Sequence, residues 1–256
     1  MPTTTLQQIR VSRNEPCWTC FSLEFNGMFD KLRQGENPTE WTVQPCAWRN
    51  DNTHIKCEYC SNHLVECARV PGLLEGNLRD LTNTIDFIRS LCSLAGDSPT
   101  GHALSRTAQT NMMRSLVKLA IGFKNVVSAH KGEHILRTGT QQALKPHLEK
   151  YQLKVDKRRQ DFATGVLQHH PYPNDGLVRL VRDDREFFAW SSHVYEFYDN
   201  LTSGLEFGRV PEEAIRMIIS HVPLVRPAQA NLLPDVIVDQ GVPMMNQLWR
   251  QEGGPN

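Results

Sequence analysis

The sequence predicts a mainly α-helical protein, in which a small cysteine-rich module at the N-terminus precedes a bundle of about five helices. Two observations predict this class. Apolar residues recur every three or four positions along most of the chain after residue 72, with little strand-like alternation. Six of the seven cysteines fall between residues 17 and 67. We expect a disordered N-terminus (1–16), the cysteine module (17–71), a helical domain (72–222) and an irregular proline-rich tail (223–256).

The cysteine module contains a long apolar insertion. Between Cys20 and Cys46 lie 25 residues, and Phe25, Met28 and Leu32 are among those spaced as on one face of a short helix. So many apolar residues in a small module indicate that the insertion packs on the helical body.

A heptad-like seam runs from Leu74 to Ala95, where apolar residues alternate at steps of four and three for about three heptads. The seam is typical of a short coiled coil that joins two copies of the chain or binds a protein partner. An amphipathic helix inside the bundle is the alternative. Cys92 lies on this seam, and we interpret it as a small buried hydrophobic residue and not a ligand.

Four further helices follow from the apolar spacing and from the Gly and Pro residues between them. The second of these contains Pro146, which either starts its main part or kinks it. The expected ranges are 104–130, a helix that follows the break at 132–139 and ends near residue 167, 177–201 and 212–221.

The formal net charge is zero, but charge is segregated along the chain. Residues 104–159 carry 12 basic and 3 acidic side chains, and residues 160–256 carry 7 and 13. Such asymmetry either marks a surface for an anionic partner or reflects basic helices that pack beside an acidic half. The basic side chains at the end of the first stretch are candidates for nucleic-acid contact: Lys145, Lys150, Lys154, Lys157, Arg158 and Arg159.

The N-terminal residues lack the apolar core of a secretion signal, and no run of about 18 apolar residues predicts a membrane span. We therefore expect a protein that is not secreted and has no membrane partner, located in the nucleus or otherwise in the cytoplasm. In a reducing compartment, clustered cysteines are metal ligands more often than disulfides.

The spacing of the six cysteines indicates a zinc site. Two C-x2-C pairs, Cys17/Cys20 and Cys57/Cys60, each bring two thiolates to one point, as tetrahedral zinc coordination requires. Cys46 and Cys67 remain, so the pairs hold one ion alone, or six thiolates hold two ions through bridging sulfurs. His54 or His63 in place of a cysteine is a further alternative.

The pattern resembles the fungal binuclear zinc cluster, the Zn2Cys6 module of fungal transcription factors, and Cys57, Cys60 and Cys67 have that family's spacing. The resemblance covers residues 17–71 and implies two zinc ions bridged by Cys17 and Cys57. It implies that Cys20 and Cys46 complete one site, and that Cys60 and Cys67 complete the other.

Two features depart from that family. Residues 47–56 contain no proline, and the stretch after the second cysteine is 25 residues long where the family has a short basic segment that enters DNA. This stretch contains only Lys31 and Arg33 as basic residues, against four acidic ones. A stretch with this charge neutralises phosphates poorly.

Two functions remain open. One is a nuclear zinc-cluster protein that regulates transcription, with possible DNA binding. The other is a zinc-stapled helical scaffold for protein interaction that does not bind DNA. The sequence contains none of the common catalytic motifs, so we do not expect an enzyme.

Overall fold

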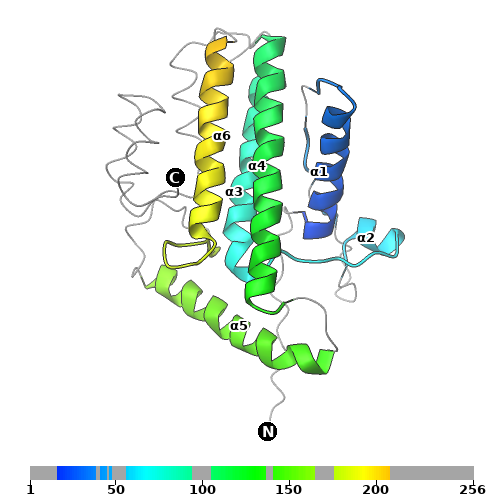
Figure 1. Cartoon of the computed structure of the whole chain (residues 1–256). Coiled ribbons are helices and arrows are strands. Elements are labelled where there is room, and N and C mark those ends of the chain that lie inside the picture. Colours follow the sequence, from blue (N-terminus) through cyan, green and yellow to red (C-terminus); the bar gives the residue numbers. More distant parts are fainter. Residues whose placement is uncertain are drawn as a thin grey trace.

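The computed structural model describes residues 16–38, 41–44, 46–47, 56–93, 105–136, 141–164 and 176–207. Within these residues the chain is mainly helical, as predicted, and contains no strand (Figure 1). The elements are α1 (Trp18–Arg33), α2 (Glu58–Asn62), a 3-10 turn η1 (Gly72–Leu74), α3 (Glu75–Ser93), α4 (Arg106–Glu133), α5 (Gln141–Ala163) and α6 (Phe187–Phe207). Residues 1–15 of the expected N-terminus (1–16), the expected helix 212–221 and the expected tail 223–256 lie outside the described residues.

The long helices α3, α4 and α6 form the body of the protein. α4 packs along α6 and also contacts α3, while α1 lies against α4 and α5 crosses one end of the bundle (Figure 1). The expected seam on α3 faces this body, because its residues from Leu74 to Cys92 are at most 6% exposed. α3 is therefore an amphipathic helix of the bundle, and its apolar seam is used inside its own chain. Cys92 is buried there, as predicted.

The insertion of the cysteine module is part of the same core. Its helix is longer than the sequence predicted and begins immediately after Cys17. Phe21, Phe25 and Met28 are buried in one cluster with apolar residues of α3, α4 and α6. The expectation that the insertion packs on the helical body is therefore confirmed.

The helix expected at 177–201 begins ten residues later, at Phe187. Residues 177–186 form an irregular segment, called the strap below, that crosses the start of α3. Arg179 makes two hydrogen bonds of 2.8 Å to Asp80, and the backbone N–H of Leu180 donates to Asn77 Oδ1 at 2.9 Å. Burying an arginine requires such a charged partner, and this contact holds the strap in a non-helical path.

Gly122 allows α4 and α6 to approach closely. A Cβ atom at this position would lie 2.4 Å from Cγ of His193 on α6, closer than two carbon atoms can pack. Gly132, in the last turn of the same helix, has no atom within 4 Å of such a Cβ.

We predict that Gly122→Ala lowers the free energy of unfolding by about 1–3 kcal/mol, because the added methyl group forces the two helices apart. Gly132→Ala is the matched control. It should raise the free energy of unfolding by about 0.5–1 kcal/mol, because alanine favours helix more than glycine does. Denaturant unfolding of both variants measures the difference, and equal effects would contradict the close packing of α4 on α6.

Candidate metal centre

Each C-x2-C pair begins a helix. Cys17 is the N-cap of α1 and Cys57 is the N-cap of α2, with nearly identical backbone angles (φ −69° and ψ 160°; φ −66° and ψ 161°). The second cysteine of each pair, Cys20 or Cys60, lies three residues further on and therefore on the same face of its helix as the first. Both pairs thus direct two sulfurs toward one point.

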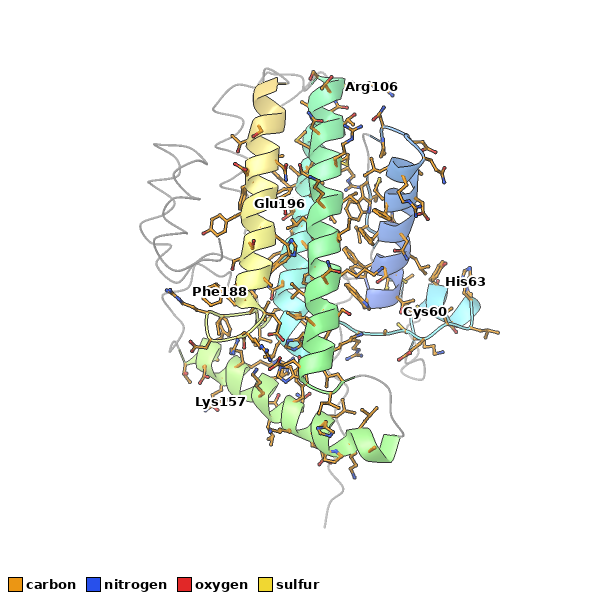
Figure 2. All side chains as sticks on the ribbon, in the orientation of Figure 1. Cys60, His63, Arg106, Lys157, Phe188 and Glu196 are labelled. Atoms are coloured by element: carbon orange, nitrogen blue, oxygen red, sulfur yellow. The ribbon has the colours of Figure 1, made fainter. Side chains whose placement is uncertain are left out.

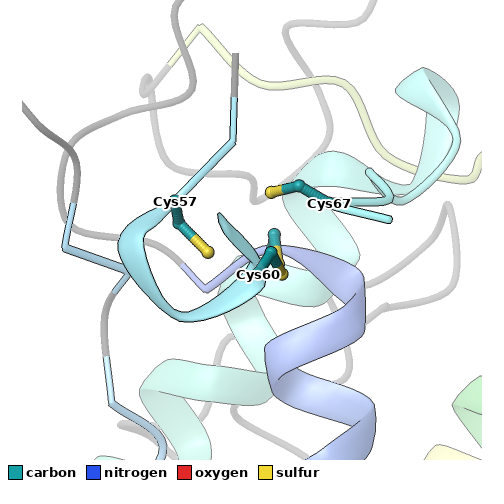
Figure 3. Close-up of side chains that lie close together, drawn as sticks. Cys57, Cys60 and Cys67 are labelled. Atoms are coloured by element: carbon teal, nitrogen blue, oxygen red, sulfur yellow. The ribbon is translucent and has the colours of Figure 1, made fainter. Parts of the chain in front are cut away.

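The six cysteines form two overlapping groups of four. Cys17 and Cys57 belong to both groups, and Figure 3 shows Cys57 close to Cys60 and Cys67. Cys20 and Cys46 complete the first group, and Cys60 and Cys67 complete the second. Within each group all four sulfur atoms lie within 4.8 Å of one another. This is the division into two sites that the resemblance implied.

The backbone around the cluster has approximate twofold symmetry. The N–H of Trp18, after Cys17, donates to the carbonyl of Ala68, after Cys67, at 2.9 Å. The corresponding bond in the opposite direction runs from the N–H of Glu58, after Cys57, to the carbonyl of Ala47, after Cys46, at 2.9 Å. Each half of the module therefore supplies three cysteines in a similar arrangement, although 25 residues separate the second from the third cysteine in one half and six do so in the other.

The sulfur distances fit tetrahedral metal coordination. Four thiolates at about 2.3 Å from a zinc ion lie about 3.8 Å from one another. Cys17 and Cys60 have sulfurs 3.7 Å apart, as do Cys20 and Cys57. These separations are far longer than a disulfide bond of about 2.05 Å, and all seven cysteines are free thiols.

The cluster without a cation favours thiols over thiolates. A hydrogen bond from Cys46 lowers the pKa of Cys17 to about 4. Burial raises the pKa of Cys20 to about 12 and that of Cys67 to about 11. Burial also raises the pKa of Cys60. One thiolate is thus stabilised by its neighbours, and further thiolates need a metal cation to offset their charge.

His63 does not join the cluster. His63 is exposed, its Nδ1 lies 2.9 Å from the carbonyl oxygen of Tyr59, and its ring stacks on that tyrosine. It belongs to neither group of potential ligands. His54 lies outside the described residues.

The two arginines predicted to contact nucleic acid make contacts within the chain. Arg158 forms two hydrogen bonds to the buried Asp184, at 2.8 and 3.0 Å, and Lys154 lies 3.6 Å from the same carboxylate. Burial alone would raise the pKa of Asp184, but the hydrogen bonds and charge of Arg158 hold that pKa below its usual value. Arg159 pairs with Glu75 at 3.2 Å. These side chains connect α5 to the strap and to α3.

The remaining three candidates, Lys145, Lys150 and Lys157, are exposed on α5. Lys145 lies 3.9 Å from Glu149 on the same helix. Figure 2 shows Lys157 on α5 and Cys60 on α2 at opposite sides of the view. The basic side chains and the cysteine cluster are therefore carried by separate elements.

A second group of possible metal ligands, His130, His134 and Glu186, was not predicted. The two histidines have the i, i+4 spacing of ligands on one helix face. We expected the helix to end at His130, so His134 fell in the predicted break. Glu186 is separated from them by more than 50 residues in the sequence, and nothing in its local pattern distinguishes it.

No protein-family model, curated protein or solved structure matches this chain. Among the helices that the structure describes, none has both the length and the apolar character needed to span a membrane. The structure thus establishes a cysteine cluster whose geometry can bind metal, within a mainly helical fold.

We predict that Phe21→Ala lowers the free energy of unfolding by about 3–5 kcal/mol, because a buried aromatic ring is replaced by a cavity. Phe21 is 1% exposed and follows Cys20 directly, so the change tests whether the cysteine module shares the core. Leu23→Ala is the control: this side chain on the same helix is 43% exposed, and its loss should cost less than about 0.5 kcal/mol. Denaturant unfolding measures both, and a small effect at Phe21 would show that α1 is independent of the helical body.

Proposed function

We propose that the six cysteines hold two zinc ions in a binuclear cluster bridged by Cys17 and Cys57. The observation that carries this proposal is the sharing of these two cysteines by both groups of four sulfurs. Two tetrahedral ions need eight ligand positions, and six thiolates fill them when two sulfurs bridge. The approximate twofold symmetry of the surrounding hydrogen bonds further supports this arrangement.

The cluster acts as a structural staple. Zinc neutralises the thiolates that burial disfavours, and a site filled by protein sulfur leaves no open position for a substrate. The ions join the first turn of α1 to α2 and to the segment that ends at Cys67. Because Phe21 and Phe25 of α1 lie in the common core, the metal also fixes one wall of the helical body.

A zinc-stapled helical scaffold for protein interaction is the function that this geometry supports best. In the fungal binuclear zinc-cluster family, which the cysteine pattern resembles, the segment after the second cysteine enters the DNA major groove. Here that segment includes α1, whose apolar face is buried against the bundle. A helix held in this way cannot enter a groove without exposing the core, so the cluster does not read DNA through α1.

Metal content of cysteine variants tests the cluster. Cys57→Ser should lose both zinc ions, because a bridging sulfur is removed, whereas Cys67→Ser should lose at most one. Cys92→Ala is the control, since this buried cysteine lies in the helical core and should leave zinc content unchanged. Elemental analysis of the purified variants measures the zinc content per chain. Loss of fewer than two zinc ions by Cys57→Ser, or equal losses by Cys57→Ser and Cys67→Ser, would overturn the bridged cluster.

A nuclear regulator of transcription that contacts nucleic acid through α5 is the second candidate. The observation that favours it is the exposure of Lys145, Lys150 and Lys157 within a stretch of net charge +9, the difference of its 12 basic and 3 acidic residues. Phosphate contacts by lysine give binding that depends on charge and not on base sequence. This role leaves the zinc cluster as a staple and moves the binding surface to α5.

DNA binding distinguishes the two candidates. If α5 contacts phosphates, the protein should bind random duplex DNA at about 50 mM salt, and replacing Lys145, Lys150 and Lys157 together by glutamine should lower the salt dependence by about one unit per lost contact. Replacing Lys31, Arg33 and Lys56 by glutamine is the matched control near the cysteine module. Fluorescence anisotropy of labelled DNA gives both values, and no salt-sensitive binding by the wild-type protein would leave the scaffold as the function.

A further inference from the structure

Two histidines and a glutamate meet where the end of α4 approaches the start of α6. His130 lies in the last turn of α4, His134 is its C-cap, and Glu186 directly precedes α6. One ligand atom from each of the three residues lies within 4.8 Å of those of the other two. None of the three belongs to the cysteine cluster.

Each residue places a buried polar atom in this group without a hydrogen-bond partner. The atoms are Nδ1 of His130, Nε2 of His134 and Oε1 of Glu186. The His130 side chain is fully buried and that of Glu186 is 8% exposed. An unpaired buried polar atom is costly, and three of them in one place need a common explanation.

We propose that His130, His134 and Glu186 bind one divalent transition-metal ion of the zinc type. Two histidines and a carboxylate are an established ligand set for zinc, and one cation would satisfy all three unpaired atoms. Ligand atoms at about 2.1 Å from such an ion lie about 3.4 Å apart. Nδ1 of His130 and Oε1 of Glu186 are 3.2 Å apart, so this pair has the required separation, and a ring nitrogen of His134 lies within 4.8 Å of a ligand atom of each.

The surroundings of the group suit a metal site. Nε2 of His130 lies 2.9 Å from the hydroxyl oxygen of Tyr151, which also accepts the backbone N–H of Leu73 at 3.1 Å. Such a partner on the second ring nitrogen orients a histidine whose first nitrogen binds metal. The contact therefore assigns Nδ1 of His130 to the ion.

A surface pocket adjoins the site at His134. His134 and Tyr151 line a pocket of about 470 Å³ at the surface, together with residues that include His147, Lys150 and Lys154. Three protein ligands leave one coordination position of a tetrahedral ion free for water or a small anion from this pocket. This open position distinguishes the site from the cysteine cluster, which protein sulfur fills.

A buried ion pair between His130 and Glu186 is the competing explanation. It accounts for the 3.2 Å contact between these two side chains. It leaves Nε2 of His134 buried without a partner. The metal ion accounts for all three atoms.

Cobalt titration of the full chain tests the proposal. Co2+ bound by thiolates produces intense sulfur charge-transfer absorption, whereas Co2+ bound by nitrogen and oxygen does not. We expect the wild-type protein to bind one equivalent of Co2+ more than His134→Ala and Glu186→Gln, with equal sulfur absorption in all three. His147→Ala is the matched control, because this histidine lines the same pocket but is not one of the three ligands, and it should bind as much Co2+ as the wild type.

Equal binding by the wild type and the two ligand variants would overturn the site. X-ray absorption at the zinc edge of the zinc-loaded wild-type protein provides a test that requires no variant to fold. Nitrogen and oxygen ligands beside sulfur are expected, and a spectrum explained by sulfur alone would also overturn the site. Loss of the sulfur absorption, by contrast, would count against the cysteine cluster and not against this site.

Discussion

The charge of the buried sulfur atoms is the constraint on which the rest of the N-terminal half depends. Six sulfurs converge within two overlapping groups, and burial raises the pKa of Cys20 and of Cys67, so that more than one thiolate is disfavoured unless a cation lies among them. Once the sulfurs are held together, the starting points of α1 and α2 are fixed, because Cys17 and Cys57 are the N-caps of these helices. α1 then carries Phe21 and Phe25 into the core, so the geometry of the cysteine cluster and the hydrophobic packing depend on each other.

Part of the segregated charge is paired within the described residues. Arg158 of the basic stretch binds Asp184 of the acidic half, and Lys118 on α4 lies 4.0 Å from Glu196 on α6. Arg179 shows the opposite case, because this basic residue lies in the acidic half and forms an ion pair with Asp80 on α3. Exposed pairs such as that of Lys118 contribute little to stability, whereas the buried pairs determine where the strap lies. Basic helices that pack beside an acidic half therefore account for part of the asymmetry.

The sequence was sufficient to predict the helical class, the packing of the insertion on the body and the cysteines that converge, because these features depend on local spacing. It was insufficient where a distant residue decides the structure. The strap at 177–186 has apolar residues that fit a helix, but its path follows from the contacts of Arg179 with Asp80 and of Leu180 with Asn77. His134 was missed for a smaller reason. α4 continues for three residues past the expected end, so two histidines of one helix face were assigned to different elements.

The contact between Arg179 and Asp80 joins residues 99 positions apart. A chain made from its N-terminus exposes α3 to its future core long before the arginine has been synthesised. Until then Asp80 is a carboxylate without its cation, and burying it would be unfavourable. The cysteines that converge, by contrast, lie within 51 residues, from 17 to 67, and are complete early. Vectorial synthesis therefore favours an order in which the sulfur cluster assembles first and the helical body closes only after the strap has left the ribosome.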